Sequence, residues 1–356
     1  MYENIKPLKV NIISDIHYYS REMGYEGKAF DKTNATASNE MVYSKEILEA
    51  LMNQLANSDS DIVLVSGAVT NKAEIPSHKG VIELLRSLKE KGKRVYVITA
   101  THDFNGDGMT YAYEGDEKKV VPGTKREELL DMYREFGPNE AIALHEDSMS
   151  YVVQLCDGYR LFALNDDRNH KGASGFSDDC FAWITEQIED AKKNGQFIIP
   201  MTHHPMLSPS PFYKIIGGGN IMGEADKRID EFTEMGLPYM FTGHTHMQDI
   251  SYKYTENGKI FYDITTAGAV GYPATFRQVT FRPAEGKIDV DSVAVDCEIN
   301  GRKLKDHLED KFFGMIRRVI EKAGSDIPEF ARMANSFSVK PGLIYKIGWV
   351  IKPFAK

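Results

Sequence analysis

Short apolar runs recur along the chain, and a polar or glycine-containing turn follows each of them. Their length and their content of Val, Ile, Leu, Phe and Tyr are typical of buried β-strands. The runs are LKVNIIS, DIVLVSG, RVYVITA, QFIIPMT, LPYMFTG and IFYDITT. Between the first three, residues 42–56 and 78–93 place apolar side chains every three or four positions, as amphipathic helices do.

Strands that alternate with helices indicate an α/β sheet with both faces covered. Two later segments, residues 150–166 and 274–295, instead predict hairpins, since each holds two apolar runs around a turn with glycine. We therefore expect an α/β protein in which a second, more antiparallel sheet packs on the first.

The whole chain is predicted to divide into a main domain, 1–298, and a basic helical tail, 299–356. Within the domain, residues 104–140 are predicted to be an irregular excursion rich in Gly, Asp, Tyr and Lys. They form either a lid or rim beside a functional site or a solvated surface insertion. A second such loop is expected at 208–220.

The tail differs from the domain in charge. Residues 301–356 hold 12 Lys and Arg against 6 Asp and Glu, and residues 304–324 have helical periodicity. Such a helix either packs its apolar stripe on the domain or contacts a membrane surface or a protein partner. We favour packing and keep peripheral membrane or protein contact as the alternative.

Composition narrows the class of protein. The apolar fraction of 42% and the charged fraction of 27% are ordinary for a globular protein, and the net charge of −9 argues against binding nucleic acid. A phosphorylated small molecule stays possible, because bound metal can invert the local charge. Three cysteines without paired spacing predict free thiols. With no signal peptide or membrane span in the sequence, we expect a cytoplasmic protein.

Histidines gather directly after the predicted strands. They lie in SDIH (14–17), ATHD (100–103), THHP (202–205) and TGHTH (242–246). Loops that leave the carboxyl ends of strands meet at one edge of an α/β sheet, where ligands bind. Imidazole and carboxylate together suit a divalent transition metal, and we expect Mn, Fe or Zn, as one or two ions.

These motifs, with SGAVT (66–70) between the first two, occur in an order that resembles the calcineurin-like metallophosphoesterase family. The resemblance covers roughly residues 9–290. It implies a four-layer α/β/β/α sandwich of two mixed sheets, with two metal ions at the strand ends, and hydrolysis of phosphate mono- or diesters.

The resemblance also implies roles for single residues. Asp15, His17 and His246 would hold one metal, and His203 and His244 the other, together with an asparagine of the family motif GNHD. A shared aspartate of the motif GD would bridge the two ions. His102 would protonate the leaving alkoxide or steady the phosphoryl oxygens. We assign Asp103 to catalysis beside it, and Thr101 and His204 to substrate binding.

Two positions depart from the family pattern. Ala68 replaces the bridging aspartate, and Thr101 replaces the asparagine. Both losses weaken the second metal, unless Asp103, Asp166 or Asp167 supplies a carboxylate. Three possibilities follow: a hydrolase with a weakened or mononuclear metal site, a degenerate relative that binds a phosphorylated ligand or partner without turnover, or an enzyme deliberately inactivated by an Asp-to-Ala change.

Overall fold

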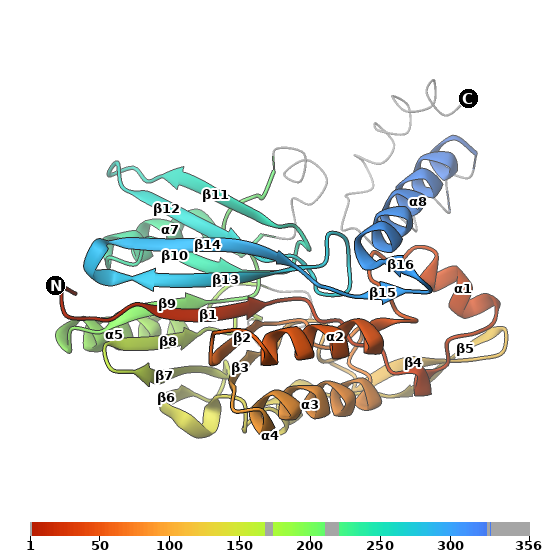
Figure 1. Cartoon of the computed structure of the whole chain (residues 1–356), viewed down its shortest axis with the longest axis horizontal. Coiled ribbons are helices and arrows are strands. Elements are labelled where there is room, and N and C mark those ends of the chain that lie inside the picture. The colour runs from red at the N-terminus through yellow and green to blue at the C-terminus, as the bar shows by residue number, and fades with distance from the viewer. Residues whose placement is uncertain (1, 168–173, 211–220, 326–327, 329–356) are drawn as a thin grey trace.

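The computed structural model describes residues 2–167, 174–210, 221–325 and 328, and two β-sheets dominate it (Figure 1). All six apolar runs singled out above form strands, and both predicted hairpins are present. The loop predicted at 208–220 lies mostly outside the described residues. The prediction of an α/β fold with two mixed sheets is confirmed.

The first sheet has five strands in the order β14-β13-β1-β2-β3. Neighbours β1, β2 and β3 are parallel, whereas β13 runs antiparallel to both β1 and β14. The bounds are β1 (Leu8–Ile13), β2 (Ile62–Ser66), β3 (Arg94–Ile98), β13 (Thr275–Arg282) and β14 (Lys287–Ala294).

The second sheet has seven strands in the order β11-β12-β10-β9-β8-β7-β6. Its four central strands are parallel, and antiparallel strands close both sides. The bounds are β6 (Ala141–His145), β7 (Ser150–Cys156), β8 (Tyr159–Ala163), β9 (Phe197–Met201), β10 (Tyr239–Thr242), β11 (Asp249–Tyr254) and β12 (Ile260–Thr265).

Alternating side chains sort the strands into separate cores. In β2, Ile62 and Leu64 belong to a cluster shared with the second sheet, whereas Val63 and Val65 face the opposite way into another cluster. In β8, Leu161 belongs to the shared cluster and Phe162 to a third. Because successive strand residues point to opposite faces, this division shows that the two sheets pack against each other and bury their outer faces elsewhere.

Helices cover those outer faces. The first cluster is completed by apolar residues of α2 (Ser44–Ala56) and α3 (Ile75–Glu90), and the third by those of α5 (Asp178–Lys193) and α7 (Ala225–Glu234). The remaining helices of the described residues are α1 (Lys28–Asn34), α4 (Arg126–Met132) and α8 (Leu304–Ser325), with short 3-10 turns η1 (Arg21–Met23), η2 (Pro138–Glu140) and η3 (Pro283–Glu285).

The segment 104–140 is not irregular, so that prediction is wrong. It forms a hairpin of β4 (Met109–Glu114) and β5 (Glu117–Pro122), followed by α4 and η2. Tyr113 of the hairpin packs with Tyr19, Met23 and Phe30 in a small fourth core. The sequence signal was weak because most residues of β5 are exposed and carry little periodic apolar pattern.

The described part of the tail packs on the domain, as favoured. Leu304 and Leu308 of α8 join the first core cluster, and Met315 is buried. A short pair of strands, β15 (Glu298–Ile299) and β16 (Arg302–Lys303), leads into the helix. None of the described helices is long and apolar enough to cross a bilayer. The domain boundary, a membrane or protein contact of the tail and the cytoplasmic location stay predictions.

Candidate metal centre

The predicted site residues follow the ends of five strands that come from both sheets. In the first sheet, Asp15 and His17 follow β1, Ala68 follows β2, and Thr101 and His102 follow β3. In the second sheet, His203 and His204 follow β9, and His244 and His246 follow β10. The turns are joined by backbone hydrogen bonds, such as those from Asp15 N to Gly67 O (3.1 Å) and from His17 N to Ala68 O (3.0 Å). The chain therefore brings these turns together at one edge.

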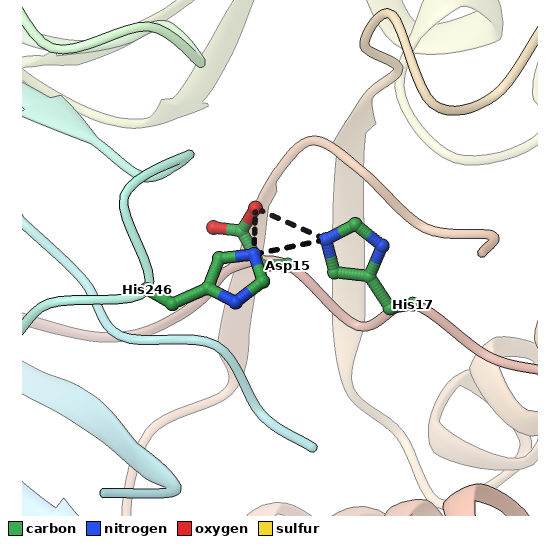
Figure 2. Close-up of side chains that lie close together, drawn as sticks. All are labelled: Asp15, His17 and His246. Carbon is green, nitrogen blue, oxygen red and sulfur yellow. Dashed lines mark hydrogen bonds and ion pairs between the residues drawn. The ribbon is translucent and has the colours of Figure 1, made fainter. Parts of the chain in front are cut away.

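Asp15, His17 and His246 converge on one point (Figure 2). Asp15 Oδ1 lies 3.5 Å from His17 Nε2 and 3.4 Å from His246 Nε2, and the two nitrogens are 3.1 Å apart. Donor atoms about 2.1 Å from a single ion in tetrahedral geometry are separated by about 3.4 Å. The spacing in this triad is therefore that of three ligands to one ion.

The hydrogen bonds of Asp15 support the same assignment. Oδ2 accepts from Ser14 Oγ and from His244 N, both at 2.7 Å. Oδ1 is buried and has no hydrogen-bond partner among the described residues. A buried carboxylate oxygen without a donor is costly unless a cation satisfies it, and the imidazole nitrogens around Oδ1 make a divalent ion the fitting group. Sequence reasoning missed Ser14, although it is the residue next to Asp15.

The protonation states also suit metal binding. Burial by itself raises the pKa of Asp15, but His246, His17 and His203 outweigh it and hold that pKa well below its ordinary value. Burial lowers the pKa of His17 and of His203, and lowers that of His244 well below the ordinary value. Near neutral pH Asp15 is thus ionised and the imidazoles of His17, His203 and His244 are neutral, which are the forms that bind metal.

His203 and His244 lie next to this triad. His203 Nε2 is 3.2 Å from His244 Nδ1 and 4.0 Å from Asp15 Oδ1. His203 is oriented by a 2.8 Å hydrogen bond between Nδ1 and Ser66 O. Within the described residues, however, no third carboxylate or imidazole converges on this pair as closely as the triad converges.

The sequence model of the calcineurin-like phosphoesterase family matches residues 8–248. The chain belongs to the calcineurin-like phosphoesterase family. It is a family of hydrolases that act on phosphate esters. Asp15, His17 and His246 all lie within the matched residues.

One solved structure supports the fold. A dimetal phosphatase from Danio rerio aligns with a TM-score of 0.53 at 12% identity, covering 81% of this chain and 99% of that one. A purple acid phosphatase from yellow lupin seeds aligns with a TM-score of 0.41 at 15% identity, covering 81% and 54%. A search of curated proteins gives no significant match. At these identities the first likeness supports the fold and nothing finer.

Ala68 occupies the place where the family pattern has its bridging aspartate. It is fully buried, with φ of 51°. The three acids considered as replacements are engaged elsewhere. Asp103 accepts from Thr70 N and Ala100 N, both at 2.8 Å. Asp166 binds both the ring and the backbone N–H of His204, and both oxygens of Asp167 accept from Arg126 Nε.

The structure also locates the other predicted site residues, Asp103, His204 and Thr101, relative to the histidines. Asp103 supports the turn that carries His102, and its charge raises the pKa of His17 in opposition to burial. His204 is held by Asp166, with its ring 4.2 Å from that of His244 between centroids. Thr101 is buried within the same turn as His102. The substrate-binding roles of Thr101 and His204 and the catalytic role of Asp103 stay predictions.

His102 lies beside the triad without joining it. Its ring meets that of His17 edge to face, with centroids 4.7 Å apart, and its Nδ1 is 2.9 Å from Asn71 O. The contact with that carbonyl fixes the orientation of the ring. Asn71 was not foreseen from the sequence. Its nearby support, Glu74, accepts from Asn71 Nδ2 and from Lys72 N.

Several site residues adopt a strained backbone. Asp15, His17, Ala68, His244 and His246 all have φ between 41° and 68°, in the left-handed region. Each such residue costs about 1–3 kcal/mol, and strain of this kind concentrates at functional sites. Close packing fixes the turns: a Cβ at Gly243 would lie 1.8 Å from Ser14 Oγ, and one at Gly67 would lie 2.6 Å from His203 Nδ1.

Proposed function

We propose that the chain hydrolyses phosphate mono- or diesters with one firmly held divalent transition metal, at Asp15, His17 and His246. The observation that carries this proposal is the buried, unpartnered Asp15 Oδ1 between two imidazole nitrogens. When bound there, the metal supplies a Lewis acid that neutralises phosphoryl charge and acidifies a water molecule.

The protein's own groups would do the rest. His102, oriented by Asn71 O beside the triad, would protonate a leaving oxygen. His203 and His244, neutral because of burial, would bind a phosphoryl oxygen or a weakly held second ion. Without a carboxylate at position 68 to offset the repulsion between two cations, the second ion is expected to bind far more weakly than the first.

The test is to measure bound metal and turnover on the same preparation. Purified protein is loaded with Mn²⁺, dialysed, and analysed for metal content, and then assayed with a phosphomonoester and a phosphodiester of nitrophenol. We expect about one ion per chain and measurable hydrolysis. Metal-free protein after loading, with no hydrolysis, would overturn the proposal.

A second candidate is a binding protein without turnover, and the loss of the acid at position 68 favours it. In that case a phosphorylated ligand would bind saturably, and it would do so whether or not the ion is present. The two candidates separate because the hydrolase requires the ion for turnover, whereas the binding protein shows no turnover with one or two equivalents of Mn²⁺.

A further inference from the structure

Asp263 is a carboxylate buried in the second sheet, beneath the turns that carry His203 and His244. It lies in β12 next to Met240 of β10 and is completely buried. It lies in the apolar run IFYDITT, and none of the roles assigned so far uses it. A buried carboxylate in a central strand is unfavourable unless its oxygens are fully hydrogen-bonded.

Its two oxygens divide their partners between two turns. Oδ2 accepts from the backbone N–H groups of Met206 (2.6 Å) and Leu207 (2.8 Å), in the loop that begins with His203 and His204. Oδ1 accepts from Thr242 Oγ1 at 2.5 Å, at the end of β10 and two residues before His244. One side chain therefore ties together the loops of both histidines.

The turn after β1, which carries Asp15 and His17, receives no such support, whereas His246 shares the turn of His244. The described hydrogen bonds of Asp263 reach Met206, Leu207, Thr242 and Thr265, and none reaches a residue next to Asp15, His17 or His246. Backbone bonds from Gly243 N to His203 O and from Thr202 N to Phe241 O, both 2.9 Å, also join the two segments, and loss of the Asp263 bonds would remove the side-chain anchor added to them. His203 Nε2 and His244 Nδ1, which the two segments carry, are 3.2 Å apart.

We propose that Asp263 is a positioning residue that sets the spacing of His203 and His244. Its effect on metal or phosphate affinity rests on the proposed function, but its effect on the two loops does not. Burial, which raises the pKa of Asp263 to about 6, agrees with a carboxyl kept in place for its hydrogen bonds in spite of the cost of ionising it.

Two variants of the full chain separate positioning from packing. In Asp263→Asn the side-chain oxygen can still accept from both backbone N–H groups, while the amide can donate to Thr242 Oγ1. In Asp263→Ala all these bonds are lost. Glu74→Ala serves as the matched control, because Glu74 is also a buried acid that accepts from a loop, but from the loop at residues 71–72.

Amide hydrogen exchange of the metal-free proteins provides a readout that needs no activity. We expect Asp263→Ala to speed exchange about tenfold or more in residues 203–208 and 242–246, because two loops lose their shared anchor. Residues 10–18 should be unaffected, and Asp263→Asn should restore slow exchange. Glu74→Ala should leave both histidine loops unchanged.

Mn²⁺ titration then links the loops to the centre. With Asp263→Ala, binding of the second equivalent or of inorganic phosphate should weaken about tenfold, and binding of the first equivalent should weaken less, because only His246 of its three ligands lies in a loosened loop. Exchange that rises equally in residues 10–18, or only around β12, would overturn the positioning role. Failure of the parent protein to bind Mn²⁺ would overturn the proposed function and leave the exchange test to decide on Asp263.

Discussion

The two halves of the candidate metal centre each contain two histidines, but only the first contains a carboxylate. In the triad of Asp15, His17 and His246, a carboxylate oxygen with no hydrogen-bond donor lies among imidazole nitrogens. In the pair of His203 and His244, the nitrogens are 3.2 Å apart and the position that should supply a carboxylate is Ala68. The triad therefore carries a negative charge that a cation would balance, whereas the pair of His203 and His244 carries no charge.

This difference in charge suits the triad to binding an ion and the pair of His203 and His244 to orienting a substrate. A neutral imidazole pair can bind a phosphoryl oxygen or a loosely held ion without the repulsion that a second firmly bound cation would bring. The second half also has supports of its own, since Ser66 orients His203, and Asp166 orients the neighbouring His204. These hydrogen bonds fix the geometry of this half, and each prediction below tests one side of the comparison.

Asp15→Asn should have the largest effect, because it removes the charge of the triad while keeping its shape. We expect Mn²⁺ affinity and turnover each to fall at least about 100-fold, since even the loss of groups that only support metal ligands costs 10- to 100-fold. Calorimetric titration and initial rates measure the two. Asp59→Asn, which changes an exposed acid paired with Lys9, is the control, and equal affinity in both variants would contradict the assignment.

His102→Ala should lower kcat about 100-fold without changing Mn²⁺ affinity, because His102 adjoins the triad but is not one of its ligands. Rates and titrations on the same sample separate the two effects. His145→Ala is the matched control, as that histidine binds Ser148 and Asp179 outside the centre. A loss of bound metal in His102→Ala would mean that this residue is a ligand.

Ala68→Asp combined with Thr101→Asn should convert the neutral half into a second metal site. Aspartate tolerates left-handed φ better than alanine, so the backbone at position 68 suits the change. We expect the metal content to rise from about one ion per chain to two. Ala68→Asn with Thr101→Asn keeps the backbone preference without the charge and should stay at one ion. One ion in both variants would show that His203 and His244 no longer form half of a binuclear centre.

The sequence predicted the parts of the centre that are local and missed those that depend on packing. The pairs in SDIH and TGHTH were predicted to meet because strand-end turns project such residues to one edge, and the structure brings Asp15, His17 and His246 together, while their role as metal ligands stays a prediction. The sequence could not show that Asp103, Asp166 and Asp167 are committed to other donors, because those partners are distant in the chain. Asp263 was visible as an acid within an apolar run, but its partners only become evident in the fold.

The smallest predicted effect concerns Asp263, which supports the half of the centre that contains His203 and His244. It is a change in the free energy of unfolding with pH. The pKa of Asp263 is raised to about 6 in the folded protein, above its ordinary value of 3.8. Between these values the folded state retains a proton that the unfolded state releases, so the contribution of Asp263 to stability is complete below pH 3.8 and is lost as the pH rises through 6.

Asp263→Asn cannot ionise and should escape that loss while keeping the loop hydrogen bonds. The free energy of unfolding of the variant, minus that of the parent, should therefore increase by about 2–3 kcal/mol between pH 4 and pH 7 and then level off. Urea unfolding of metal-free protein at several pH values measures this difference. Asp190→Asn, which changes an exposed acid paired with the buried Arg160, should show no such rise. A flat difference for Asp263→Asn would mean that its carboxylate is as well stabilised in the fold as in water, and the neutral half would then rest on an ordinary ionised acid.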